Sequence, residues 1–242
     1  MDLQKKIVKQ IEFYLSDYNL PYDKFLWTLH DKNPGHWIPI TTLANFKKMK
    51  SLTEDLQVVV EALKNHKSDD IEIDESEKKV RRKTEPVELD LKARTIHAKG
   101  FPLVDMAPGV EDPKEALIKL QDDIEDCFAE KGSVKCIRLK YNNDVKPRTF
   151  KGSAYVTFSS EEEAKTVADL KNIKFKDEDI ELMYRPDYMK MKEEQYKDAS
   201  QNSKRQYQFN AFKAINSKSQ PQKKRDLEDA AEAPESKKTK QE

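Results

Sequence analysis

Aromatic and amide side chains crowd the stretch QIEFYLSDYNLPYDKFL at positions 10–26. A flat ring can stack on an unpaired base, and an amide can hydrogen-bond the edge of that base. On a helical wheel, Tyr14 and Tyr18 fall on the apolar stripe, so we expect both rings in the core. Phe13 lies about 120° away from the centre of that stripe, beside Gln10. A phenyl ring beside an amide is an incomplete base-binding site, although one exposed Phe is also common without function.

The elements that must position these side chains form a first domain, predicted over residues 1–85. Apolar spacing predicts a helix from Leu3, a short helix from about Asp23, and a further helix through Leu43, Phe46 and Met49. Ser51 and Glu54 form a capping-box pattern that opens another helix. HWIPI predicts a small strand, and DIEIDESEKKVRR predicts two strands joined by a turn. Three or more helices with a small sheet indicate a winged-helix unit.

A linker is predicted over residues 86–92 and a second domain over 93–186. Strands are expected at 94–99, 133–141, 150–158 and 180–185, and helices at 113–130 and 160–171. Asp112 is the expected cap of the first helix, and Ser160 with Glu163 forms a capping box for the second. The βαββαβ order predicts a four-stranded antiparallel sheet with both helices on one face and the other face open. The fold class is therefore α+β, with a possible C-terminal helix at 187–198 and a disordered basic tail at 199–242.

Composition limits the classes of function. The 242 residues contain 45 cations and 45 anions, so the chain has no net charge, but residues 201–225 hold seven cations and no acid. The two cysteines, Cys127 and Cys136, suit a reducing compartment and no metal site, and the lack of a long apolar run predicts a soluble intracellular protein without membrane contact. No grouping of nucleophile, base and orienting residue, and no phosphate-cradling glycine loop, is present, so we expect neither an enzyme nor a cofactor.

The opening stretch, followed by WIPI, LANFKKM and LTEDLQVVVEAL, resembles the La motif, the winged-helix-like module of La proteins. The second domain resembles the RNA-recognition motif that follows it in this family, so the resemblance covers about residues 3–185. It implies a nuclear, non-enzymatic RNA chaperone that holds the 3′-terminal UUU-OH of new RNA polymerase III transcripts. Such a protein shields these ends from 3′ exonucleases and assists precursor-tRNA maturation.

The resemblance also assigns roles in the first domain. Gln10 would hydrogen-bond the penultimate uracil, Asp23 would accept hydrogen bonds from both hydroxyls of the terminal ribose, and a set of rings would stack on the last bases: Phe13, Tyr14, Phe25 and Phe46. Lys47, where the family often has Asn, becomes a phosphate contact. Plainer interpretations remain open, since Asp23 suits a helix N-cap, Phe25 and Phe46 suit core stripes, and Gln10 suits a solvated surface.

The octamer KGSAYVTF at 151–158 fits the RNA-recognition pattern except at Ser153, where a ring is expected. Tyr155 and His97 occupy the other two ring positions, so we expect the sheet face to bind RNA weakly by itself. The remaining contact candidates of this domain follow the second strand and the octamer: Cys136, Ile137, Arg138, Lys140 and Lys151.

The basic tail is expected to contact RNA, because Tyr207, Phe209 and Phe212 are interleaved with its cations. Two basic clusters resemble a bipartite nuclear-import signal read by an import receptor: Lys223, Lys224 and Arg225, then Lys237, Lys238 and Lys240. A monomer is the default state. One alternative is a La-related subunit dedicated to one stable nuclear RNA. However, the 57 residues from Pro186 onward are too few and too polar for its extra domain, which favours the compact, fungal-like form of the La family. The other, a winged-helix DNA-binding factor, is disfavoured because the helix at 53–66 offers few groups for reading the major groove.

Overall fold

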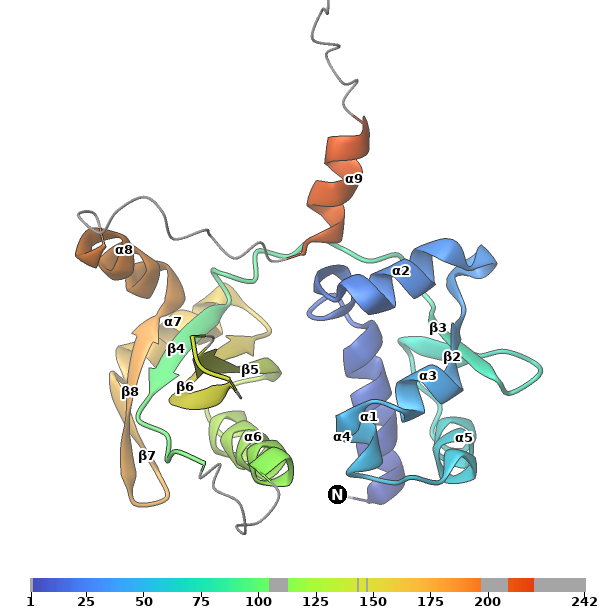
Figure 1. Cartoon of the computed structure of the whole chain (residues 1–242), viewed down its shortest axis with the longest axis horizontal. Helices are drawn as coiled ribbons and strands as arrows, with labels where there is room; N and C mark the ends of the chain where they lie inside the picture. Colours follow the sequence, from blue (N-terminus) through green and yellow to red (C-terminus); the bar gives the residue numbers. More distant parts are fainter. Residues whose placement is uncertain (1, 105–112, 143, 147, 197–208, 220–242) are drawn as a thin grey trace, which may run out of the picture.

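Two domains lie side by side in the computed structural model, which describes residues 2–104, 113–142, 144–146, 148–196 and 209–219 (Figure 1). Each domain has a separate hydrophobic core. The mixed α+β class predicted from the sequence is confirmed. None of the helices in the described residues is both long and apolar enough to cross a membrane.

The N-terminal domain is built on helices α1 (Leu3–Leu15), α2 (Lys24–Lys32) and α5 (Leu56–Asn65), joined by short turns of helix. These turns are η1 (Leu20–Tyr22), η2 (Pro34–His36), α3 (Ile40–Ala44) and α4 (Lys47–Lys50). The apolar stripe of α1 supplies Ile7, Ile11 and Leu15 to the core, as its spacing predicts.

Two expectations about these helices are wrong. The single helix expected through Leu43, Phe46 and Met49 is broken at Phe46, whose extended backbone (φ −70°, ψ 143°) separates α3 from α4. The expected Ser51 and Glu54 capping box does not form, because Ser51 ends α4 instead. The cap of α5 is Asp55, whose carboxylate accepts the Gln57 amide at 2.8 Å.

A small antiparallel sheet completes the winged-helix arrangement. Its strands are β1 (Ile38–Pro39), β2 (Ile71–Ile73) and β3 (Lys79–Arg82), in the order β1-β3-β2. Val80 at the centre of β3 faces Ile38 on one side and Ile73 on the other, and it is fully buried. The sheet therefore packs one face on the helices.

The C-terminal domain is a five-stranded antiparallel sheet with helices α6 (Pro113–Ala129) and α7 (Glu161–Asp169) on one face (Figure 1). The strands are β4 (Thr95–Lys99), β5 (Val134–Asn142), β6 (Thr149–Phe158), β7 (Asn172–Phe175) and β8 (Glu178–Tyr184), in the order β5-β6-β4-β8-β7. Strand β7 is one more than the four expected, and it forms a hairpin with β8. The predicted cap of α7 is confirmed, because Ser160 accepts the Glu163 amide at 3.1 Å.

Two further helices follow the sheet. Helix α8 (Arg185–Gln195) contacts β4 and β8 across the face that was expected to be open. Helix α9 (Ala211–Ser219) lies in the segment expected to be disordered, and it contacts η1 of the N-terminal domain. Both expectations are therefore corrected for these residues. The expected cap Asp112 and all six import-signal residues (Lys223, Lys224, Arg225, Lys237, Lys238 and Lys240) lie outside the described residues.

Candidate nucleic-acid interface

Four rings of the N-terminal domain make a continuous series. Phe13 contacts Tyr14 at 6.2 Å between ring centroids, Tyr14 meets Phe46 edge-on at 5.0 Å, and Phe46 contacts Phe25 at 6.1 Å. The rings come from α1, from the residue before α4 and from the first turn of α2. Phe25 is 54% exposed, whereas Tyr14 is 8% exposed. The prediction that Tyr14 is a core residue is confirmed, and the series ends in a ring that is free to stack.

Gln10 is tied to this ring series through Tyr14. The Tyr14 hydroxyl hydrogen-bonds to the Gln10 side chain and to the Met49 main chain, and burial raises the pKa of that hydroxyl well above its usual value. The phenol is thus neutral and acts as a fixed anchor. Because one end of the Gln10 amide is held in this way, the side chain is oriented beside the rings and is not a freely moving surface group.

Asp23 lies at the opposite end of the ring series and caps α2. Its Oδ1 accepts the amides of Phe25 at 2.9 Å and Leu26 at 3.0 Å. The N-cap interpretation of Asp23 is therefore confirmed. Both capping bonds use the same oxygen, so the carboxylate sits half-exposed, next to Phe25, with Oδ2 outside these two bonds. A carboxylate in this position is a strong acceptor for sugar hydroxyls.

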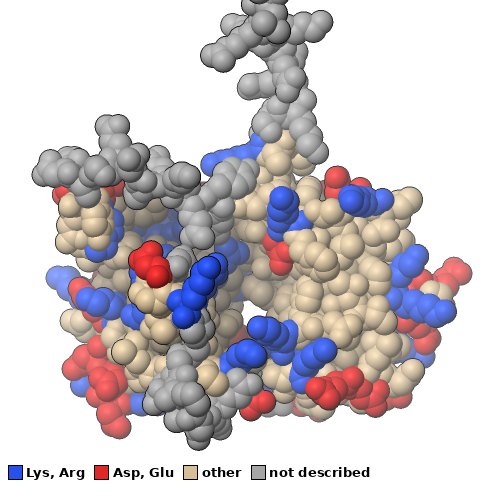
Figure 2. Space-filling model, in the orientation of Figure 1, with Lys and Arg blue, Asp and Glu red and all other residues tan. Residues whose placement is uncertain are grey.

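Basic side chains, Lys or Arg, gather near the boundary between the domains on the side shown in Figure 2. Lys47, exposed, follows Phe46 directly and begins α4. Its neighbour Lys48 pairs with Asp122 of α6, and Lys9 of α1 pairs with Glu125 of the same helix. The acidic face of α6 thus meets basic side chains of the N-terminal domain.

The ring positions of the sheet in the second domain are covered. His97 is 6% exposed, and the ring of Tyr188 from α8 stacks on it at 3.9 Å with an interplanar angle of 10°. The half-buried Tyr155 ring has the Lys140 ammonium at 4.6 Å and the Arg185 guanidinium at 4.3 Å from its centroid. The stacking surface of this face is therefore occupied by the protein's own side chains.

Burial of His97 lowers its pKa to about 4, and the nearby cations Lys140, Lys99 and Lys192 act in the same direction. The imidazole is therefore neutral at pH 7. Ser153, the third expected platform position, is 7% exposed and offers no ring.

The edge strand β5 distributes its candidate residues over both faces of the sheet. Ile137 packs in the core with the helices and is 7% exposed, and its carbonyl accepts the Gln121 amide at 3.4 Å. Cys136 is also buried, which raises the pKa of its thiol. Arg138 donates to the Tyr18 carbonyl at 3.1 Å, and Lys151 is exposed. Side-chain contact with RNA from Ile137 and Cys136 is thus blocked by packing, and β5 lies at the edge of the sheet with its Ile137 carbonyl bonded to Gln121.

Two residues for which the sequence predicts other roles, Tyr18 and Arg138, help to hold the two domains together. Tyr18, expected in the core of α1, lies beyond the end of that helix and hydrogen-bonds to Arg94 of the second domain. The Arg138 guanidinium also lies 5.8 Å from the centroid of the Tyr22 ring. The sequence signal for Tyr18 and Tyr22 is their position after the last turn of α1, where a helical stripe no longer applies. Within the described residues no cluster of His, Cys, Asp or Glu is arranged to hold a metal.

The sequence matches the La domain family over residues 7–65 and the RNA recognition motif family over residues 120–181. It is 32% identical to "Lupus La protein homolog B" of Xenopus laevis over 81% of this chain and 44% of that protein. It is 31% identical to "La protein homolog" of Drosophila melanogaster over 84% of this chain and 50% of that protein. A solved La motif from the Dictyostelium discoideum La protein is 40% identical, covers 36% of this chain and 96% of that structure, and has a TM-score of 0.31.

A La domain followed by an RNA recognition motif defines an RNA-binding protein. The chain belongs to the La protein family. It spans half or less of the length of the curated relatives named above.

Proposed function

We propose that this protein captures the 3′-terminal UUU-OH of new RNA polymerase III transcripts, protects these ends from 3′ exonucleases and assists precursor-tRNA maturation. The observation that supports the proposal best is the ring series of the N-terminal domain, with Gln10 held at one end and Asp23 at the other. Stacking, edge recognition and end recognition are thereby available within one site.

Each part of this site has a chemical role. The exposed Phe25 ring and its neighbour Phe46 stack on the last bases, which is sequence-tolerant and supplies affinity. The oriented Gln10 amide reads the edge of a uracil. Asp23 accepts hydrogen bonds from the two hydroxyls of the terminal ribose, while its charge repels a 3′-phosphate. A 2′-hydroxyl partner also favours RNA over DNA.

The second domain and the C-terminal segment support this capture. With its ring positions covered by α8, the sheet face contributes little stacking, so the second domain acts through the edge of β5 and through Lys151 and Lys140. The cations after residue 203 add sequence-independent phosphate contacts. The protein works in the nucleus as a monomer, and the basic clusters after residue 222 bind an import receptor.

The proposal is tested by binding a ten-nucleotide RNA that ends in UUU-OH, against the same RNA ending in CCC-OH, at fixed salt. Replacing Phe25 with Ala is expected to weaken the U-ended complex about tenfold, from stacking of 1–3 kcal/mol per base. Tyr196→Ala is the matched control, because this ring is 62% exposed but lies at the end of α8. Equal affinity for both RNAs, or an equal loss in the two variants, would contradict the proposed site.

A further inference from the structure

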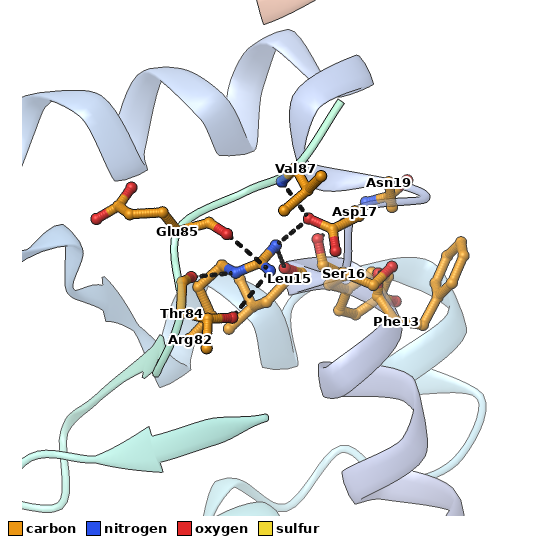
Figure 3. Close-up of polar contacts among 10 residues, drawn as sticks. Phe13, Leu15, Ser16, Asp17, Asn19, Arg82, Thr84, Glu85 and Val87 are labelled. Carbon is orange, nitrogen blue, oxygen red and sulfur yellow. Dashed lines mark hydrogen bonds and ion pairs between the residues drawn. The ribbon is translucent and has the colours of Figure 1, made fainter. Parts of the chain in front are cut away.

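A network of hydrogen bonds joins the end of α1 to the end of β3 behind the ring series. The Arg82 guanidinium donates to the Leu15 carbonyl at 3.1 Å and to Asp17 Oδ1 at 2.8 Å, and its side chain is only 10% exposed (Figure 3). The same guanidinium group donates to the carbonyl oxygens of Thr84 at 2.6 Å and Glu85 at 3.4 Å. The Arg82 guanidinium therefore holds the first residues after β3 through their carbonyl oxygens.

Asp17 extends the network into the linker. Its Oδ1, which already accepts from Arg82, also accepts the Val87 amide at 2.8 Å (Figure 3). Further along, the Tyr22 hydroxyl donates to the Leu89 carbonyl at 3.3 Å. Asp90 Oδ1 then accepts the amides of Lys92 and Ala93 in the turn that leads to β4. The linker thus follows a route bonded to the N-terminal domain and is not a free tether.

The second domain contacts the segment immediately after Asp17. Arg138 donates to the Tyr18 carbonyl, and Arg94 hydrogen-bonds to the Tyr18 side chain. The contacted segment, residues 17–22, lies in the sequence between the two halves of the candidate site, Gln10–Tyr14 and Asp23–Phe25. In Figure 3 the Phe13 ring points away from the Arg82 network, so the two functions use opposite sides of the same stretch.

We propose that Asp17 and Arg82 are positioning residues, which fix the linker so that Arg138 of the edge strand β5 stays against residues 17–22, the segment between the two halves of the candidate site. They touch no RNA. A free tether of this length holds the second domain at an effective concentration on the order of millimolar in many orientations. Fixing its route restricts those orientations and spares the RNA the entropic cost of ordering the two domains.

The first test needs no RNA. NMR relaxation of the full chain measures the rotational correlation time of each domain. Wild type is expected to show one shared time, and Asp17→Ala is expected to show two shorter ones. Asp17→Asn retains the acceptor oxygen and should restore the shared time, whereas Arg81→Lys is the matched control. Arg81 is adjacent in sequence but pairs with Glu72 in the small sheet at 2.6 Å, away from the linker. A single shared time in Asp17→Ala, or separate tumbling in Arg81→Lys, would overturn the proposal.

The second test rests on the proposed function and uses ten-nucleotide RNAs that end in UUU with a 3′-hydroxyl or a 3′-phosphate. Asp17→Ala is expected to weaken binding of the hydroxyl RNA about tenfold while the ratio between the two RNAs stays unchanged, because the end contact itself is intact. A changed ratio would make Asp17 part of the end site and overturn its positioning role. If wild type shows no preference between the RNAs, the proposed function fails, and the tumbling result alone decides the positioning role.

Discussion

Asp23 combines a structural and a proposed recognition role, and two substitutions separate them. Its Oδ1 accepts two amides of the first turn of α2, so Asp23→Ala removes both capping bonds. Loss of an N-cap costs about 1 kcal/mol of stability. Asp23→Asn keeps a carbonyl oxygen in the same position, and Asn caps as well as Asp, so we expect its stability to lie within about 0.5 kcal/mol of wild type.

Asp23→Asn, although as stable as wild type, should differ from wild type in its affinity for RNA. The asparagine lacks the charge that strengthens hydrogen bonds to ribose hydroxyls, a difference of about 1–1.5 kcal/mol, so affinity for UUU-OH falls about tenfold. Affinity for the 3′-phosphate RNA rises, because the repulsion between two anions is gone. Asp23→Asn therefore loses end discrimination while remaining folded.

The assay pairs urea unfolding with fluorescence anisotropy of the two labelled RNAs. Asp55→Ala is the matched control, since Asp55 caps α5 through the Gln57 amide and is not a candidate RNA contact. It should lose about 1 kcal/mol of stability with unchanged RNA discrimination. The reasoning is refuted if Asp23→Asn discriminates between the RNAs as wild type does, or if Asp55→Ala loses discrimination.

Three further predictions concern α8, the buried histidine and α9. Tyr188→Ala uncovers His97 and thereby adds one stacking surface, so we expect it to bind an RNA without a terminal U run about threefold more tightly, as measured by fluorescence anisotropy. Unchanged affinity would show that α8 does not cover the binding face. With a folded pKa of about 4 against an unfolded value of 6.5, neutral His97 supports the fold above pH 6.5, and this support is lost as the pH falls toward 4. Between pH 7 and pH 5, the free energy of unfolding of wild type should therefore fall by about 2 kcal/mol more than that of His97→Phe, as measured by urea unfolding at both pH values. An equal fall in the two proteins would contradict this assignment. Ala211 is fully buried at the start of α9, and the Phe212 ring lies 6.4 Å from the Trp27 ring of α2. Ala211→Glu should therefore undock α9 and increase amide hydrogen exchange in α2, whereas the control Ile215→Glu, at a 49% exposed position, should not. Equal exchange in the two variants would contradict docking.

Periodicity predicted the elements that bury a regular stripe. The stripe of α1 placed Ile7, Ile11 and Tyr14 in the core, and the structure buries all three. The capping box at Ser160 was also readable, because the hydroxyl and the Glu163 amide are neighbours in one turn. These features depend on contacts within one helix or between adjacent residues.

The sequence was less informative where distant segments meet. Tyr18 continues the spacing of α1, yet the helix ends at Leu15 and the ring faces the second domain. Strand β7 was missed because its turn to β8 has no glycine, and Lys176 adopts the left-handed conformation there (φ 54°). The sequence predicts a helix at 187–198 but leaves open whether it covers the sheet, and the structure places α8 against β4 and β8. This contact is made by individual side chains, Tyr188 on His97 and Arg185 on Tyr155, and not by a regular apolar stripe.

The candidate site shows the same division. The rings and Gln10 were predicted from the family resemblance, and the structure brings them together. The inward direction of Ile137 was not predictable, because register shifts in β5 on either side of Cys136–Leu139 decide which side chains face the helices. The contribution of the rings and of Gln10 to RNA binding stays a prediction.

The most direct test of the central proposal is the affinity of the wild-type chain for one short RNA ending in UUU, with a free 3′-hydroxyl or a 3′-phosphate, at fixed salt. A carboxylate that accepts both ribose hydroxyls predicts at least a tenfold preference for the hydroxyl form. Equal affinity would contradict end recognition at Asp23 and would leave the rings and lysines as a general RNA-binding surface.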